Sequence, residues 1–390
     1  MTYLTIGVGG DYADWYTAMV YLNGLGNLVD DYTLTQISDV TISGTLPSIA
    51  LQNNSITITS NSDPQGNPNG GWITYLPQNY SMIFNNSSNY PGGSSMGPKP
   101  GSIIVEYINL HVVGTGTGGY RLHTIMGSAT VRDCIICGNN YYTSPPSTPA
   151  DVGYSFENFS SSSYIIYNNK FYNCAYGIYW AQGGTITGSP FDPPGTKVIE
   201  NCSIYGGTVG IIHAYNSLFG ALLEYWDYKN IVCSGQSGFG SAAFIMTDLQ
   251  PVNTMTNCAA HDSSLPSFCT NPITGIIDSD FLSVNIADSN FLDIDTDSAL
   301  FGTGTTNISA FNTEDIDGDP RPNGRGSVSI GADEPLILST INQMFRKEGL
   351  LCFASENSIQ DGLFAHRLSN QNIKSSDLIE LVDDTASLSL

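Results

Sequence analysis

The stretch that decides the fold is IENCSIYGGTVGII, residues 199–212. It alternates apolar runs of a few residues with bend-forming residues, first Asn201 and then the pair Gly206 and Gly207. Such short strands, with no strong helical periodicity between them, do not fit a βαβ sheet, whose crossover connections need helices. They fit a solenoid, in which each short strand pairs with its equivalents in the coils above and below.

An apolar-x-Asn/Asp-apolar unit recurs along the chain. Its Asn or Asp positions advance by 24, 36, 32, 29 and 27 residues, which is the spacing of solenoid coils with loops of variable length. Because Asn and Asp tolerate the left-handed conformation and bond to their own backbone, we expect a corner between two coil strands at each position rather than a ligand site. The six positions are Asn109, Asp133, Asn169, Asn201, Asn230 and Asn257.

The N-terminal residues can cap the first coil, whose core would otherwise be exposed. Asp14 is placed to N-cap a helix in which Trp15, Met19 and Leu22 share one apolar face, and glycines follow the helix. We therefore expect a short strand and a capping helix within residues 1–30.

Two further stretches resemble a known family. TIGVGGDYA (5–13) is similar to the start of many right-handed parallel β-helix proteins of the pectate-lyase-like superfamily. DIDGDPRPNG (315–324) followed by IGADE (330–334) resembles the terminal motif of bacterial and viral β-helix repeat proteins, and FLD (291–293) with SAL (298–300) matches the segment before that motif. The resemblance implies a right-handed parallel β-helix of the phage-spike or virion-protein type. The superfamily includes lyases, hydrolases, adhesins and phage spikes, so function has to be argued from the site.

The predicted fold class is accordingly all-β, a right-handed parallel β-helix solenoid with an N-terminal capping helix and a small C-terminal appendage. We expect the β-helix to span residues 31–335. Residues 336–390 lie beyond the terminal motif and are too few for more than a marginal core. We expect them to serve in docking or oligomerisation.

Composition excludes several classes of partner. Twelve Lys+Arg against thirty-five Asp+Glu give a net charge of −23, which disfavours nucleic acid and anionic membranes because both are bound through cationic side chains. The longest apolar runs are also far short of a membrane span. Residues 1–7 carry neither a basic nor an apolar signal-peptide region, so we expect no signal peptide and a location on a virion surface or outside the cell.

The cysteines and basic residues have structural interpretations. The cysteines lie within apolar runs such as CIIC (134–137), so we expect buried thiols rather than disulfides or a metal site. Lyases that share the resemblance are expected to use Ca²⁺ and an Arg or Lys base. Here Arg132 and Lys229 lie in repeat units, while Arg321 and Arg325 belong to the terminal motif.

Acidic residues provide two candidates for chemistry. A glycosidase needs two converging carboxyl groups, and no such pair is visible among the sparse acids of the repeats, although coil stacking can bring distant ones together. Asp315, Asp317 and Asp319 form an Asp-x-Asp-x-Asp run that can bind a hard cation, so Ca²⁺ is the one cofactor considered. The competing interpretation is a tight turn in which the carboxylates accept backbone N–H bonds.

Aromatic residues crowd into the middle of the chain. Half of them must point inward, because side chains alternate along a strand, and the outward half can form flat faces suited to stacking on sugar rings. The alternative is that they belong to the core or to a subunit interface. The candidate glycan-binding residues are Tyr142, Tyr164, Tyr176, Tyr179 and Trp180.

Three hypotheses for function remain. The first is a non-enzymatic virion surface protein, such as a spike, fibre or capsid decoration, that forms a homotrimer, contacts other virion proteins and adheres to host surface glycan. The second is a β-helix polysaccharide-degrading enzyme, either a glycoside hydrolase or a lyase. The third is a purely structural coat component without a ligand.

Overall fold

The structure is a computed structural model of the 390-residue chain. It describes residues 1–26, 28–42, 46–47, 49–50, 54–60, 72–75, 82–85, 102–112, 120–125, 128–139, 152–157, 163–181, 195–214, 226–238, 240–247, 253–322, 326–335, 345–347 and 350–352. Among these residues no helix has the length and apolarity needed to cross a membrane.

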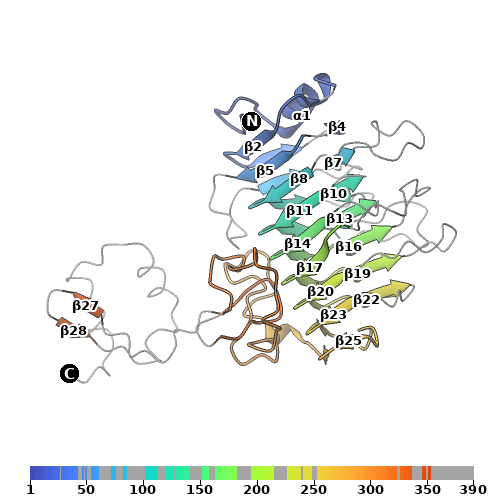
Figure 1. Ribbon diagram of the computed structural model, residues 1–390, viewed down its shortest axis with the longest axis vertical. Helices are drawn as coiled ribbons and strands as arrows, with labels where there is room; N and C mark the ends of the chain where they lie inside the picture. Colours follow the sequence, from blue (N-terminus) through green and yellow to red (C-terminus); the bar gives the residue numbers. More distant parts are fainter. Residues whose placement is uncertain are drawn as a thin grey trace. The chain divides into compact units, whose positions relative to one another are not determined.

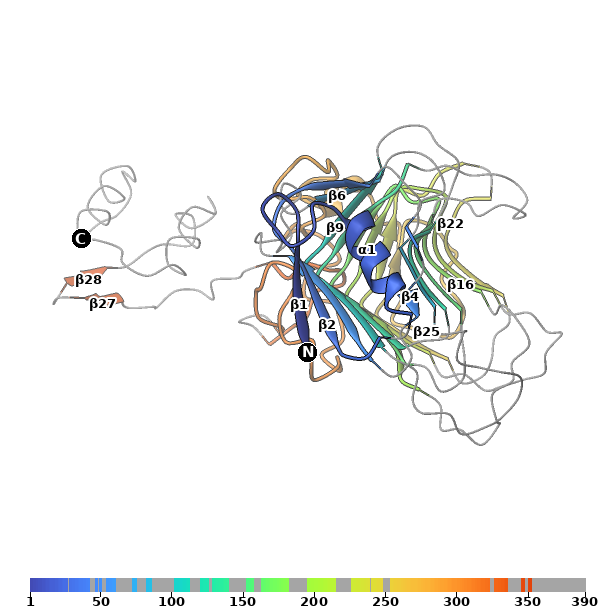
Figure 2. The same ribbon diagram turned by 90° about the horizontal axis from the view of Figure 1, so that it is seen from above.

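Three parallel sheets form the walls of a β-helix, as Figures 1 and 2 show. In stacking order, sheet 1 contains β1 (Thr2–Ile6), β2 (Tyr32–Gln36), β5 (Ile56–Ser60), β8 (Ser102–Glu106), β11 (Ser128–Arg132), β14 (Tyr164–Tyr167), β17 (Lys197–Glu200), β20 (Asp227–Lys229), β23 (Thr254–Thr256) and β25 (Cys269–Thr270). Sheet 2 contains β3 (Val40–Ile42), β6 (Trp72–Tyr75), β9 (Asn109–Val112), β12 (Ile135–Cys137), β15 (Lys170–Tyr172), β18 (Ser203–Tyr205), β21 (Val232–Ser234), β24 (Ala259–Ala260) and β26 (Ile273–Thr274). Sheet 3 contains β4 (Ile49–Ala50), β7 (Met82–Asn85), β10 (Tyr120–Ile125), β13 (Val152–Glu157), β16 (Tyr176–Ala181), β19 (Val209–Ala214) and β22 (Ala242–Thr247). The all-β parallel solenoid predicted from the sequence is confirmed.

The corner between sheet 1 and sheet 2 is made by one left-handed residue in each coil from β8 onward. These residues have φ between 51° and 54°, and they are Tyr107, Asp133, Asn168, Asn201, Asn230, Asn257 and Asn271. Four predicted corners are therefore confirmed, and two were placed too late in the chain. Asn169 lies one residue past the corner, where its amide donates to the carbonyls of Val131 (2.8 Å) and Tyr167 (2.9 Å). Asn109 lies two residues past Tyr107 and accepts a bond from the Ile135 N–H (3.3 Å).

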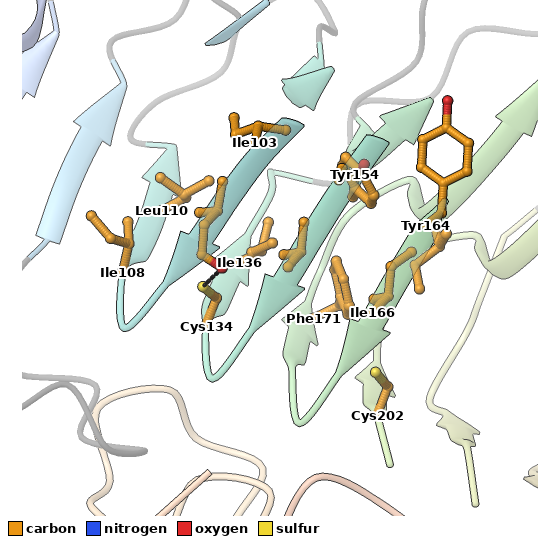
Figure 3. Packing of buried hydrophobic residues seen from close by; sticks show 14 of the residues in the cluster. Ile103, Ile108, Leu110, Cys134, Ile136, Tyr154, Tyr164, Ile166, Phe171 and Cys202 are labelled. Carbon is orange, nitrogen blue, oxygen red and sulfur yellow. Dashed lines mark hydrogen bonds between the residues drawn. The ribbon is translucent and has the colours of Figure 1, made fainter. Parts of the chain in front are cut away.

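Rows of apolar side chains from successive coils fill the interior of the shaft. Figure 3 shows Ile103, Ile166 and Phe171 among the buried side chains that the coils contribute. The expected burial of the thiols is confirmed for the seven cysteines whose side chains the structure describes, and these seven are free. Cys134 lies in this interior, whereas Cys137 packs in a second cluster outside it, as strand alternation requires.

The predicted capping helix is present as α1 (Trp15–Gly24). The Asp14 carboxylate accepts a bond from the Thr17 N–H (2.8 Å), and Trp15, Met19 and Leu22 are buried. The indole N–H of Trp15 also donates to the Gln36 side chain on β2 (2.9 Å), which ties the helix to the first coils. Seen from above in Figure 2, α1 lies across the end of the shaft.

Residues 275–322 and 327–335 fold back along the side of the shaft, although the sequence placed them inside the β-helix. The coil strands end at Thr274, and the described residues that follow form turns, isolated bridges and a short 3₁₀ helix (Asp278–Asp280) beside sheet 2. Their apolar side chains cover the outer face of sheet 2. We call residues 275–322 and 327–335 the lateral segment.

A second hydrophobic cluster joins the lateral segment to sheet 2. From the shaft it contains residues such as Ile135 and Val232, and from the lateral segment residues such as Phe291, Ile316 and Ile330. At Gly331 the approach is so close that a Cβ atom would lie 2.9 Å from the Ser203 hydroxyl oxygen. The lateral segment is therefore a packed layer rather than a closing coil.

Contacts divide the chain into two units. The first is Met1–Pro322 with Ser327–Pro335, and the second is Asn323–Gly326 with Leu336–Leu390. In the second unit the structure describes an antiparallel hairpin of β27 (Phe345–Lys347) and β28 (Leu350–Cys352).

Candidate functional site

The candidate glycan-binding aromatics that the structure describes separate into buried and partly buried residues. Tyr164 and Trp180 are core residues, 0% and 3% exposed, so they cannot face a glycan from outside the shaft. Trp180 instead packs inside against His213, with ring centroids 4.1 Å apart. Tyr142 lies outside the described residues.

Tyr176 and Tyr179 keep the geometry expected of a sugar-stacking surface. Both lie on β16, both are only partly buried, and neither belongs to the core of the shaft. Their rings are stacked, with centroids 5.7 Å apart and planes inclined by 23°. Two adjacent phenol rings combine flat apolar faces with hydroxyl groups, the features on which the glycan-binding prediction rests.

Two outward aromatics of sheet 2 serve the lateral segment instead. Tyr172 and Tyr205 stack on each other at 6.3 Å, and Phe291 meets Tyr172 edge-on at 5.2 Å. The Tyr205 hydroxyl donates to Asp278 of the lateral segment (2.7 Å). Tyr172 and Tyr205 therefore serve packing rather than ligand contact.

The Asp315 carboxylate is used within a turn. It accepts N–H bonds from Asp317 (2.9 Å), Asp319 (2.7 Å) and Glu334 (2.7 Å). Burial raises the pKa of Asp315 above its ordinary value, although Arg321 and these N–H donors act in the opposite direction. The tight-turn interpretation thus fits Asp315 better than a Ca²⁺ ligand does, because its lone pairs already meet three donors.

Asp317 belongs to a different group of carboxylates. Oxygen atoms of Asp293, Asp317 and Asp333 all lie within 4.8 Å of one another. Lys170, on β15, is fully buried and places its Nζ 2.7 Å from Asp293 Oδ1 and 3.8 Å from Asp317 Oδ2. The lysine ammonium therefore faces two of the three acids that could bind a metal ion, and a cation beside the site disfavours Ca²⁺ there.

Burial sets the charge state of this Lys170 cluster. It raises the pKa of Asp317 to about 8 and that of Asp333 well above its ordinary value. Burial alone would lower the pKa of Lys170, but the attraction of Asp293, Asp317 and Asp333 outweighs it and the pKa is raised. The cluster is thus one ammonium facing three acids, of which some hold protons at neutral pH.

A second charged group lies on the sheet 1 side of the shaft. Arg132 binds Glu106 one coil back (Nη2 to Oε2, 2.5 Å) and Asp133 (Nη1 to Oδ2, 3.1 Å), and it lies over the Tyr107 ring at 5.0 Å. Burial raises the pKa of Asp133 to about 7. Burial lowers the pKa of Arg132, but Tyr167, Glu106 and Asp133 raise it more, so this guanidinium stays protonated and is a poor base.

One feature of the sequence points to the burial of Lys170. In the sheet 2 register Lys170 pairs with Ile135 on one side and Ser203 on the other, and the next residue in the row is Val232. A lysine in a row of small or apolar residues indicates a buried partner. Asp293 and Asp333 gave no such sign, because their approach to Lys170 depends on how the lateral segment packs.

The stability of the protein is expected to fall as pH rises through neutrality, and Asp317→Asn is expected to reduce this fall. The folded-state pKa of Asp317, about 8, is above its ordinary value, so between about pH 4 and 8 the folded state holds a proton that the unfolded chain has released. The stability that this proton contributes is present at low pH and is lost as the pH rises from about 4 to about 8. Its side chain is 30% exposed, so solvent screens part of the effect.

Urea unfolding of wild type and Asp317→Asn at a series of pH values measures this dependence. Asparagine imitates the protonated acid and cannot titrate, so the slope of stability against pH should be smaller in the variant. Equal slopes would show that Asp317 is ionised in the folded protein.

Comparison with known proteins adds little to this geometry. The chain matches no protein-family model. No curated protein matches it either. A solved structure described as the crystal structure of pectate lyase Pel9A is similar to the chain, with a TM-score of 0.31 and 12% sequence identity over 85% of this chain and 96% of that chain. At this TM-score the similarity supports no argument about function, which has to come from the chain's own residues.

Proposed function

We propose that this protein is a non-enzymatic surface protein of a virion, a spike, fibre or capsid decoration, that adheres to host surface glycan through Tyr176 and Tyr179. The observation that supports adhesion is the stacked pair of partly exposed tyrosine rings on β16, outside the shaft core. The lateral segment supports a structural role, because it adds a packed second layer to one face of the shaft.

Removal of the two rings is expected to weaken glycan binding. The double change Tyr176→Ala and Tyr179→Ala should lower affinity about tenfold or more, since stacked aromatic contacts contribute on the order of 1 kcal/mol each. Retention on immobilised bacterial surface polysaccharides, compared across a panel, measures this. Tyr3→Ala is the control, because Tyr3 is a 68% exposed tyrosine on β1, at the N-terminal end of the shaft. Unchanged binding in the double variant would contradict adhesion at this place.

The proposed assembly is a homotrimer that also contacts other virion proteins. Light scattering of the full chain measures the mass directly. A trimer mass supports a spike or fibre, and a stable monomer argues against both.

Cleavage of polysaccharide is a second candidate function, favoured by the Arg132 group. It holds two carboxyl groups on adjacent coils, Glu106 and Asp133, and an acid with a pKa of about 7 is suited to protonate a leaving group near neutral pH. Against it, Asp133 is only 4% exposed and forms a coil corner. If the protein cleaves glycan there, Asp133→Asn should abolish the activity, and Asp227→Asn, which changes a more exposed acid of sheet 1, should not.

A further inference from the structure

The contact between Lys170 and Asp293 joins two parts of the chain that are 123 residues apart. Lys170 is on the outer face of sheet 2, and Asp293 is in the lateral segment, directly after the fully buried Phe291 and Leu292. The lysine side chain is 0% exposed and that of Asp293 is 17% exposed. The amine nitrogen and a carboxyl oxygen are therefore held 2.7 Å apart in a nearly dry site.

This burial is unfavourable for the two groups as ions. Removing an ammonium and a carboxylate from water costs several kcal/mol for each, and mutual attraction does not always offset that cost. Here the site also contains Asp317 and Asp333, so one cation faces three acids. A reaction that removes one positive and one negative charge from the site would relieve this cost.

We propose that Lys170 and Asp293 condense to form an intramolecular isopeptide bond between Lys170 Nζ and Asp293 Cγ. The Asp293 Cγ is one covalent bond from the oxygen that Lys170 Nζ contacts, so the nucleophile and the carbonyl carbon are already adjacent. Fixed proximity of this kind is the largest advantage an intramolecular reaction can have.

The atoms of the step balance without any further reactant. Within the hydrogen bond the Lys170 ammonium passes one proton to the Asp293 carboxylate, which gives a neutral amine and a carboxylic acid. The nitrogen lone pair then attacks Cγ and forms the N–C bond. A second proton moves from nitrogen to the departing hydroxyl, the C–O bond breaks, and one water molecule leaves.

Two neighbours are placed to assist as positioning residues. Asp317 Oδ2 is 3.8 Å from Lys170 Nζ, too far for a direct hydrogen bond but close enough to attract the ammonium and hold the lysine side chain in place. Asp333 accepts a bond from the Ile294 N–H (2.8 Å), next to Asp293 in the chain, and its oxygen lies within 4.8 Å of the others. Asp333 thus fixes the backbone that carries Asp293 and offers a polar partner to the amide once it has formed.

The bond would lock the lateral segment to the shaft. The seven cysteines whose side chains the structure describes are free and form no disulfide. An amide link between β15 and the lateral segment would supply the covalent cross-link that the thiols do not. Unlike a disulfide it would withstand reducing agents.

The test is the mass of the full chain after denaturation. The wild-type protein is expected to be lighter than its sequence mass by one water molecule, whereas Lys170→Arg, which keeps the charge, is expected to show its full sequence mass. A chymotryptic digest should contain one branched peptide, because cleavage sites at Tyr167 and Phe171 flank Lys170 and sites at Phe291 and Leu292 precede Asp293. A folded wild-type protein with its full mass, or a water loss without the branched peptide, would overturn the proposal.

Two further measurements keep the result independent of how the Arg variant folds. In Asp293→Asn the same attack would release ammonia in place of water, so the mass loss should change to that of one ammonia molecule. Lys229 and Asp227 provide a matched control within the wild-type chain. Their atoms are also 2.7 Å apart, but their side chains are 12% and 33% exposed, and we expect no bond between them.

Discussion

Replacing Gly207 with alanine is expected to destabilise the protein by about 4 kcal/mol, against about 1 kcal/mol for the same change at Gly240. The two glycines have nearly the same backbone, with φ of +75° and +74°. A Cβ atom on Gly207 would lie 1.7 Å from the Cys174 carbonyl oxygen of the preceding coil, whereas a Cβ on Gly240 would meet nothing within 4 Å. The difference in stability between the two variants therefore measures the clash between stacked coils, because the cost of the left-handed backbone is the same in both.

Urea unfolding of the two variants beside wild type measures this difference. Backbone cannot move as a side-chain tip can, so relief of the Gly207 clash requires the coils to separate. If the two variants are equally stable, the coils are not packed as closely at this corner as the structure has them.

Lys170→Met is expected to cost about 3–5 kcal/mol at neutral pH. Methionine keeps much of the side-chain volume but leaves Asp293, Asp317 and Asp333 together without a cation. Acid should reduce the loss, because the remaining carboxyl groups take up protons and no longer repel one another. The expectation holds whether Lys170 is an ion or an amide, since either form neutralises the site.

The control for this prediction replaces both members of the pair. Lys170→Met combined with Asp293→Leu removes one charge of each sign and should recover part of the lost stability, as paired hydrophobic replacements of buried ion pairs often do. Denaturant unfolding at about pH 5 and pH 8 compares the variants. A loss below about 1 kcal/mol for Lys170→Met would place Lys170 in a solvated position instead.

Local chemistry explains why much of the shaft was predictable. Asn201, Asn230 and Asn257 mark corners because a left-handed residue is needed there, and few residue types adopt that conformation. The same rule misplaced the corner at Asn169, because two asparagines are adjacent and only Asn168 is left-handed. It also missed Tyr107, a residue type that rarely adopts this conformation.

The lateral segment could not be predicted, for a physical reason. Phe291, Ile316 and Ile330 show only that this segment buries apolar surface, and this does not distinguish a further coil from a layer on sheet 2. The Lys170 cluster forms because this segment packs on sheet 2, so the cluster could not be predicted from the sequence either. Likewise, alternation predicted that half of the aromatics face outward, but Tyr172 and Tyr205 face the lateral segment while Tyr176 and Tyr179 remain partly exposed.

The most direct test of the proposed function is the chain length of a polysaccharide that the protein binds. The protein is incubated with a purified surface polysaccharide that it retains, and the product is sized by gel filtration. Adhesion without catalysis predicts that the polysaccharide is bound through Tyr176 and Tyr179 and recovered at its original length. Reproducible shortening that disappears in Asp133→Asn would contradict the account and establish a polysaccharide-degrading enzyme.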